Sequence, residues 1–366
     1  MTLKPTQTEL TARARADLRM GLPVVLEIGG HAGLVAAAET VDAGRLSDLR
    51  GFGPLLLAIT PRRAATLKAR AYSDHVARVH VPRDEGVEWV LGVADPKDDL
   101  MKPMKGPLMT ERGGDEGVAR AAIALAKSAM LLPAALVVPV ENGAEVALSH
   151  GLTRVDLTGR PDDPPVTAME EVVSARVPLE VSEAGRLHIF RPVDGGEEHY
   201  AVEIGRPDRD HPVLARLHSA CFTGDLLGSL KCDCGPQLAA ALQAMAQEAD
   251  KGGWGILLYM RQEGRGIGII NKLRAYRLQD QGHDTVDANQ RLGLPDEARD
   301  FHTAARMLAL LDIADLRLLT NNPRKVAALE AQGLSVSERV PHAPGANPQN
   351  ARYLATKRDR SGHLLP

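Results

Sequence analysis

The chain has 366 residues, of which 44% are hydrophobic and 25% charged, and its formal net charge is −3 at pH 7. This composition is typical of globular proteins and excludes a disordered or fibrous chain, and the length allows two domains. A slightly negative chain offers no broad basic surface for nucleic acid or an anionic membrane, so we expect neither partner, and any phosphate-binding site must be local.

No segment combines the length and the apolarity of a membrane-spanning helix. The longest apolar stretch, residues 129–140, is interrupted by Pro133 and Pro139 and is shorter than the roughly 20 residues that a span needs. The first 21 residues carry polar and charged residues throughout and lack the apolar core of a signal peptide. We therefore expect a cytoplasmic location.

The first part of the chain alternates strand-like and helical segments, which predicts an α/β domain. Apolar runs at 23–28, 54–60 and 135–140 are typical of buried strands. The stretch 117–129 is helical in pattern.

A proline-rich break separates two domains. Residues 159–167, GRPDDPPVT, contain three prolines and two aspartates, which is typical of a linker. We predict a first domain over residues 1–160, a linker over 161–176 and a second domain over 177–366.

The second domain begins with the alternating pattern of strands and continues with mixed elements. Residues 186–191 and 198–204 alternate, so that Tyr200, Val202 and Ile204 share one face. The predicted fold class is α/β (α+β), with two domains that each contain a mixed sheet and helices. The further predicted elements are helices at 237–249 and 269–281, strands at 254–260 and 316–320, and a helix that starts at Asn322-Pro323 and ends at Gly333.

All three cysteines, Cys221, Cys232 and Cys234, fall within fourteen residues. Two cysteines separated by one residue can face one ion from a tight turn, and a loop of ten residues can bring in the third. Tetrahedral zinc binds thiolates, and three protein ligands with an open fourth position are typical of catalytic zinc, which lowers the pKa of a bound water towards about 7. We predict one zinc ion in this domain. The alternatives are buried thiols without a metal and a structural site completed by His218 or His211.

Residues 261–277 form a basic segment that leaves an apolar strand and enters a helix. They carry five basic residues against one acidic residue, together with three glycines. Glycines allow close backbone approach and a helix N-terminus attracts phosphate, so the segment predicts a polyphosphate pocket; a solvated basic helix face is the alternative. Residues 320–326, which include Lys325, follow another strand in the same way.

Three long motifs, at residues 218–238 (HSACFTGDLLGSLKCDCGPQL), 259–293 and 317–334, closely resemble GTP cyclohydrolase II, the first enzyme of riboflavin biosynthesis. The resemblance covers residues 177–366, including the closing segment 353–365. Because these matches are long and preserve their spacing, they are highly specific.

The resemblance implies hydrolysis of GTP to formate, pyrophosphate and 2,5-diamino-6-ribosylamino-4(3H)-pyrimidinone 5′-phosphate by a homodimer, with Mg²⁺ at the GTP phosphates. Cys221, Cys232 and Cys234 would hold zinc, whose hydroxide attacks C8 of the guanine. Arg299 matches the arginine proposed as nucleophile towards the α-phosphate, with Glu297 as its catalytic carboxylate. The positions that match GTP-binding residues are Arg216, Gln237, Glu263, Gly264, Arg265, Tyr276, Thr285, Thr320 and Lys325.

Two positions depart from the family pattern. Ala220 stands where the family has an acid, with no evident replacement, and Glu297 stands where it has the catalytic aspartate. A displacement of about 1 Å can lower a rate on the order of a hundredfold; the neighbouring Asp296 is a candidate substitute. The alternative function is therefore a GTP-binding regulatory protein with little or no turnover. Retention of Arg299, Tyr276 and the thiols favours the enzyme, and Tyr276 argues against a cyclohydrolase that stops at the ring-opened formamide.

The first domain resembles the scaffold of 3,4-dihydroxy-2-butanone 4-phosphate synthase, the usual fusion partner of this family. Residues 24–41 and 54–67 carry the match. Where the synthase has carboxylates for Mg²⁺, residues 29–33 are GGHAG, and residues 117–121 are GVARA in place of its G-H-T-E-A. Since hard cations need oxygen ligands, we predict a catalytically inactive domain retained for packing, dimerisation or regulation, in which His31 is a surface or loop histidine.

Overall fold

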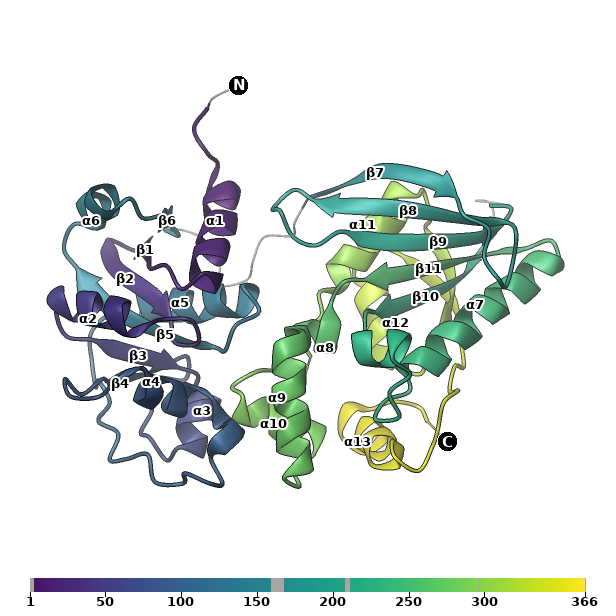
Figure 1. The fold of residues 1–366 in the computed structure, drawn as a ribbon. Helices are drawn as coiled ribbons and strands as arrows, with labels where there is room; N and C mark the ends of the chain where they lie inside the picture. Colours follow the sequence, from purple (N-terminus) through teal and green to yellow (C-terminus); the bar gives the residue numbers. More distant parts are fainter. Residues whose placement is uncertain (1–2, 159–167, 208–210, 296, 366) are drawn as a thin grey trace. The chain divides into compact units, whose positions relative to one another are not determined.

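The computed structural model describes residues 3–158, 168–207, 211–295 and 297–365, which form two compact units (Figure 1). The first unit contains Met1–Pro164 and Ile270–Asp296, and the second contains Pro165–Ile269 and Glu297–Pro366. Each unit has a mixed sheet with helices, which confirms the predicted fold class. Within the described ranges, no helix is long and apolar enough to cross a membrane.

The first unit is built on a six-stranded sheet. Its strands are β1 (Val24–Ile28), β2 (His31–Ala37), β3 (Leu56–Ile59), β4 (Ala77–His80), β5 (Ala134–Val140) and β6 (Arg154–Asp156). Their order is β4-β3-β5-β2-β1-β6, and the neighbours are antiparallel except for β1 and β6, which are parallel. The three apolar runs predicted as strands form β1, β3 and β5.

Helices complete the core of the first unit. They are α1 (Gln7–Arg19), α2 (Ala43–Gly51), α3 (Pro61–Thr66), α4 (Val87–Ala94), the short 3-10 helix η1 (Pro96–Asp98), α5 (Gly117–Ser128), α6 (Gly143–His150), α9 (Gly268–Asp280) and α10 (Thr285–Arg291). Along α5, Val118, Ala122 and Ile123 recur at helical spacing, and they pack in one cluster with Val35 of β2 and Val137 of β5.

The second unit is built on a seven-stranded sheet. Its strands are β7 (Met169–Arg176), β8 (Gly185–Pro192), β9 (His199–Gly205), β10 (Val213–Ser219), β11 (Trp254–Met260), β12 (Asp315–Leu319) and β13 (Ser335–Val340). Their order is β13-β12-β10-β11-β9-β8-β7. The strands from β13 to β11 run parallel, whereas β11, β9, β8 and β7 pair antiparallel.

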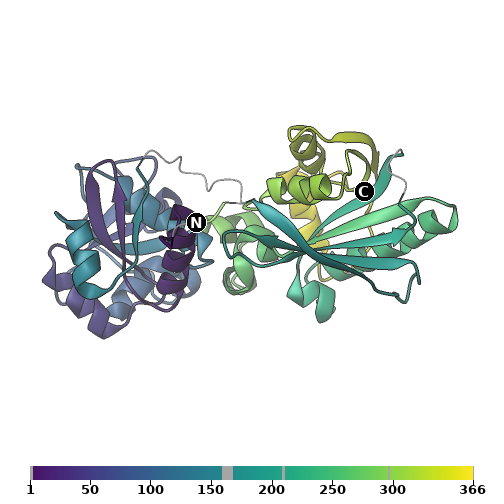
Figure 2. The ribbon, with the colours of Figure 1, turned by 90° about the horizontal axis from the view of Figure 1, so that it is seen from above.

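Helices cover both faces of this sheet (Figure 2), so its central strands are apolar on both sides. The helical elements are the π-helical turn η2 (Phe222–Leu226), α7 (Cys234–Asp250), α8 (Glu263–Gly266), α11 (Phe301–Leu310), α12 (Pro323–Glu330) and α13 (Ala351–Ser361). Along β11, Trp254 and Ile256 pack in one cluster with Met307 of α11. Leu257 points to the opposite face, where it packs with Met245 of α7.

Local signals set several boundaries as predicted. Helix α12 begins at Pro323, and the side chain of Asn322 accepts a hydrogen bond from the N–H of Arg324 at 3.0 Å. Helix α9 ends at Asp280, and Gly282 follows with a φ of +101°.

The region around the predicted linker and one helical segment depart from the simple division into two domains. Residues 159–167 lie outside the described residues, and the remainder of the predicted linker, Met169–Arg176, forms β7 paired with β8. Residues 270–296, which the sequence places in the second domain, belong to the first unit. Side chains of this segment, such as Arg274 and Asn271, form hydrogen bonds with the rest of that unit.

A buried ion pair holds α3 in the first unit. The guanidinium of Arg63 donates to Asp99 (Nη2–Oδ1 3.0 Å) and to the carbonyl of Val93 (Nε–O 2.8 Å). Burial by itself raises the pKa of Asp99, but hydrogen bonds and charges from Arg63 and Lys105 outweigh it and hold that pKa below its ordinary value.

We expect Asp99→Asn to lower the free energy of unfolding by about 3 kcal/mol at pH 7, because the buried Arg63 charge loses its partner. Since the pKa of Asp99 is lower in the folded state, this stabilisation is present above the unfolded value of about 3.9 and disappears as pH falls through the folded value. Chemical denaturation should therefore show a difference that shrinks on acidification. Asp98→Asn, adjacent and more exposed, is the control. A loss of unfolding free energy that is equal at pH 7 and at acidic pH would contradict the assignment.

Candidate functional site

The candidate site of the second unit lies where three adjacent parallel strands end. In the order β12-β10-β11, Thr320 follows β12, Cys221 follows β10 and Glu263 follows β11. The carboxyl ends of parallel strands lie at one edge of a sheet, where ligands usually bind. The sheet therefore gathers residues from distant parts of the sequence, with Cys221 and Thr320 the farthest apart.

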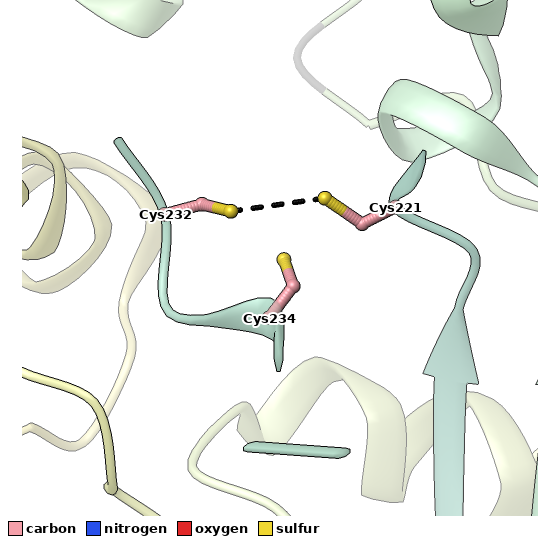
Figure 3. Close-up of side chains that lie close together, drawn as sticks. All are labelled: Cys221, Cys232 and Cys234. Atoms are coloured by element: carbon pink, nitrogen blue, oxygen red, sulfur yellow. Dashed lines mark hydrogen bonds between the residues drawn. The ribbon is translucent and has the colours of Figure 1, made fainter. Parts of the chain in front are cut away.

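The three cysteines converge from two elements (Figure 3). Cys221 precedes η2, Cys232 lies just before α7, and Cys234 is the first residue of α7. The Cys221 and Cys232 sulfurs are 3.7 Å apart, and all three sulfurs lie within 4.8 Å of one another. Among the described residues they are the only group of three or more His, Cys, Asp or Glu side chains able to hold a metal ion, and neither His218 nor His211 belongs to it.

The surroundings of the thiols fit a metal that takes sulfur ligands. A Cβ at Gly224 would lie 2.8 Å from the Cys232 sulfur and 3.0 Å from the Cys221 sulfur. Any residue other than glycine at this position would therefore displace the sulfurs. Hydrogen bonding with Cys221 raises the pKa of Cys232, and it raises that of Cys234 well above its ordinary value. A bound cation would relieve the repulsion between neighbouring thiolates.

Asp225 fixes the loop that carries Cys221. Its carboxylate accepts hydrogen bonds from the Cys221 N–H (3.0 Å) and the Tyr259 hydroxyl (2.9 Å), and it lies 3.1 Å from Nε2 of His218. Burial lowers the pKa of His218, whereas burial and the neighbouring Asp225 raise that of Tyr259. Asp225 is not among the predicted site residues, although its place between two predicted metal ligands is a signal in the sequence.

A second carboxylate reaches the same loop from the turn after β11. Glu263 accepts a hydrogen bond from the Phe222 N–H at 2.6 Å, so acidic groups lie beside the first cysteine even though Ala220 carries none. Gly264 and Arg265 follow with φ values of 64° and 63°. A non-glycine residue in this left-handed region costs about 1–3 kcal/mol, and such strain often marks a functional turn.

A chain of polar groups links β10 to the C-terminal helix. Arg216 donates to the Leu319 carbonyl (2.9 Å) and to Oε1 of Gln237 (2.5 Å), whose Nε2 donates to Asp233 (2.6 Å). Lys357 of α13 donates to the other oxygen of Asp233 at 2.7 Å. Arg216 and Gln237 are among the predicted site residues, whereas Asp233 and Lys357 are not.

Buried cations outnumber their carboxylate partners here. Burial lowers the pKa of Arg216 to about 10. Burial, reinforced by the charges of Arg299 and Arg216, lowers that of Lys325 well below its ordinary range. The Lys325 ammonium donates to the Leu217 carbonyl at 2.8 Å, and Nε of Arg216 is a buried donor without a partner among the described residues. Thr320 accepts a hydrogen bond from the Asn322 N–H at 3.1 Å.

Glu297 and Arg299 form a close ion pair. Glu297 accepts hydrogen bonds from the Arg299 N–H (3.1 Å), from its Nε (2.6 Å) and from its Nη2. Burial raises the pKa of Glu297, but bonding to Arg299 outweighs it and the net pKa lies below the ordinary value. Asp296, the candidate substitute, lies outside the described residues.

Tyr276 and Thr285 belong to the first unit, whereas the other predicted site residues belong to the second. The Lys272 ammonium lies 5.7 Å from the centre of the Tyr276 ring. Thr285 begins α10, and its hydroxyl accepts a hydrogen bond from Gln279 at 3.3 Å.

The first unit contains a cavity of about 710 Å³. Its wall includes His31, which is exposed, and three carboxylates that the resemblance did not indicate, Glu111, Asp115 and Glu141. Within the described part of the chain these carboxylates are not gathered as a metal-binding group.

Two solved structures are similar to the chain at low identity. A two-domain 3,4-dihydroxy-2-butanone 4-phosphate synthase from A. baumannii is 17% identical, with 91% of this chain and 99% of that chain covered and a TM-score of 0.32. A 3,4-dihydroxy-2-butanone 4-phosphate synthase in complex with two magnesium ions is 15% identical, with 40% and 91% covered and a TM-score of 0.30. Similarity at this level carries no functional argument.

Sequence relatives are much closer. The family profile of GTP cyclohydrolase II matches residues 170–341. GTP cyclohydrolase-2 of Azotobacter vinelandii is 56% identical over 179 residues, which is 49% of this chain and 84% of that protein. GTP cyclohydrolase-2 of Azospirillum brasilense is 44% identical over 363 residues, which is 96% of this chain and 93% of that protein. With identity at this level along nearly the whole chain, the protein belongs to the GTP cyclohydrolase II family.

Proposed function

We propose that this protein hydrolyses GTP, opening the imidazole ring of the guanine and releasing formate and pyrophosphate, as the first step of riboflavin biosynthesis. The observation that carries the proposal is the pair of buried cations Arg216 and Lys325, whose pKa values are lowered by burial and, further, by the neighbouring charge of Arg299. An anion with several charges stabilises such a group. A triphosphate is such an anion, and membership in the family points to guanosine as the rest of the substrate.

The proposed roles in substrate binding follow from position and charge. Arg216 and Lys325 bind phosphate, and Gln237 orients the Arg216 guanidinium through its 2.5 Å bond. The strained turn after β11 lies at the same edge of the sheet. The further residues proposed to bind GTP are Glu263, Gly264, Arg265, Tyr276, Thr285 and Thr320.

We assign one zinc ion to Cys221, Cys232 and Cys234. When bound, zinc supplies a Lewis acid that generates a nucleophile from water at neutral pH, suited to attack at C8 of the guanine. The chain fixes the first ligand from two sides: Asp225 accepts the Cys221 N–H and Glu263 accepts the Phe222 N–H.

Arg299 is the proposed nucleophile towards the α-phosphate, and Glu297 is its proton acceptor. Glu297 is ionised at neutral pH because its pKa is lowered, and its Oε1 lies 2.6 Å from Nε of Arg299. A carboxylate at this distance can hold the guanidinium in place and accept its proton.

The proposal also includes Mg²⁺ carried by the GTP phosphates, a homodimer and a cytoplasmic location without nucleic-acid or membrane partners. Mg²⁺ commonly binds through substrate phosphates rather than through a protein cage. These elements rest on the family resemblance and on the composition of the chain.

We expect Cys232→Ser to remove zinc and formate release together. Loss of a residue that hydrogen-bonds to a metal ligand costs about 10–100-fold in metal affinity or activity. Loss of a ligand itself should cost at least as much. Metal analysis and formate release from GTP are the measurements, with the adjacent, exposed Lys231→Ser as control. Purified wild-type protein without zinc would rule out the metal assignment.

We expect Arg299→Ala to abolish pyrophosphate release from GTP, because the proposed nucleophile is lost. Glu297→Asp should leave turnover unchanged or raise it, since it restores the shorter carboxylate of the family. Arg306→Ala, exposed on α11, is the matched control. Full activity of Glu297→Ala would show that another group accepts the proton.

We expect the full-length protein to form no dihydroxybutanone phosphate from ribulose 5-phosphate with Mg²⁺. Enediolate formation needs a base and a metal in fixed geometry, and the described carboxylates around the first-unit cavity do not gather for a metal. Product analysis by chromatography, with an active synthase as positive control, checks this. Turnover would show that the domain is catalytic.

A further inference from the structure

The helical segment of residues 270–296 packs within the first unit, although the sequence places it in the second domain. It carries two proposed GTP-binding residues, Tyr276 and Thr285, yet it belongs to the first unit. In the sequence it begins five residues after Arg265 and ends immediately before Glu297. Its contacts within the first unit therefore bear on these two proposed GTP-binding residues.

Arg274 of α9 is the centre of this attachment. Its guanidinium binds Glu39 through two hydrogen bonds, Nη1–Oε2 at 3.1 Å and Nη2–Oε1 at 3.0 Å, and binds Asp95 through Nε at 3.2 Å. The side chains are 15%, 12% and 2% exposed, respectively. Paired arginine–carboxylate contacts of this kind are strong and fix orientation as well as distance.

The partners of Arg274 are themselves fixed by the first unit. Glu39 accepts the Leu132 N–H at 2.7 Å, and Asp95 caps η1 by accepting the Lys97 N–H at 2.9 Å. Breaking a buried pair leaves an unpaired charge in a low-dielectric setting, which is strongly unfavourable.

Further contacts attach both helices of the segment. Asn271, which is buried, donates to the Met130 carbonyl at 3.3 Å. Near the other end, Arg62 donates to the Leu294 carbonyl at 3.0 Å. Gly293 has a φ of +74°, and a Cβ there would lie 2.3 Å from the Thr60 hydroxyl oxygen, so the chain passes too close to α3 for a side chain.

We propose that the first domain positions the GTP-binding segment: Glu39 and Asp95, acting through Arg274, hold residues 270–296 in the conformation that binds the substrate. The inference rests on the proposed function, which places Tyr276 and Thr285 in the GTP site. A segment already ordered before the substrate arrives binds it with less loss of conformational entropy. This gives a physical reason for the presence of a domain that we predict to have no catalysis of its own.

The test compares two carboxylates of the first domain that each pair with an arginine of α9 in the full-length protein. Glu39→Gln weakens the buried pair with Arg274. Asp98→Asn, the control, weakens the pair with Arg277, whose side chain is 59% exposed and whose contribution is small. We expect Glu39→Gln to raise the KM for GTP about tenfold with a smaller change in kcat, and to accelerate hydrogen exchange in residues 270–296. Zinc content should not change.

A double-mutant cycle separates positioning from general destabilisation. If Glu39 acts through Arg274, the variant with both Glu39→Gln and Arg274→Gln should have the KM of Arg274→Gln alone. Loss of folded protein alone would lower kcat and leave KM unchanged. If Arg274→Gln does not fold, Glu39→Gln carries the test, because it retains the Asp95 contact.

The inference is overturned if Glu39→Gln has the KM and the exchange rates of Asp98→Asn. Failure of the proposed function gives a different result. If the wild-type protein binds GTP but releases no formate, the proposed hydrolase function is contradicted. The variants are then compared by their dissociation constants for GTP, measured by calorimetry, in place of KM. Wild-type protein that does not bind GTP contradicts both proposals.

Discussion

Lys325 is buried on α12, and its ammonium donates to a carbonyl of β10 rather than to a carboxylate. Arg216, buried on β10, likewise donates to a carbonyl and an amide oxygen. Neutral oxygens stabilise these cations only in part, as the lowered pKa values of both side chains indicate. An anion bound beside Arg216 and Lys325 would offset this excess of buried positive charge.

The parallel strands make that arrangement possible. Three neighbouring strands end at one edge, so the turn after each contributes to one place. Regular ladders keep the strand ends rigid, while the turns can adopt strained conformations such as that of Arg265. Asp225 then couples the cysteine loop after β10 to Tyr259 of β11. The three cysteines and Glu263 thus follow adjacent strands at one edge of the sheet.

The carboxylates of the first unit serve its own packing, and in our proposal they also position a GTP-binding segment. Its cavity retains carboxylates, but among the described residues no group is gathered for a metal ion there. Its buried carboxylates Glu39 and Asp95 are instead occupied by Arg274, from a segment 235 positions later than Glu39. Electrostatic pairing in a desolvated interface is specific, since a wrong partner would leave charges unpaired.

The sequence by itself determined the local features. Periodicity indicated the main strands and helices, the Asn322-Pro323 pair marked the start of α12, and the spacing of three cysteines predicted their convergence. The long motifs also identified the family before any geometry was known. Each of these features depends on residues that are close together in the chain, so it can be predicted from the sequence alone.

Only the tertiary structure decided which distant groups meet. Nothing near Asp233 in the sequence indicates Lys357, and nothing near Glu39 indicates Arg274. The assignment of residues 270–296 to the first unit was likewise hidden, because a helical pattern shows which face is apolar but not which sheet covers it. Such pairings are fixed by burial and charge compensation between segments far apart in the chain, and these energies exist only once the chain has folded.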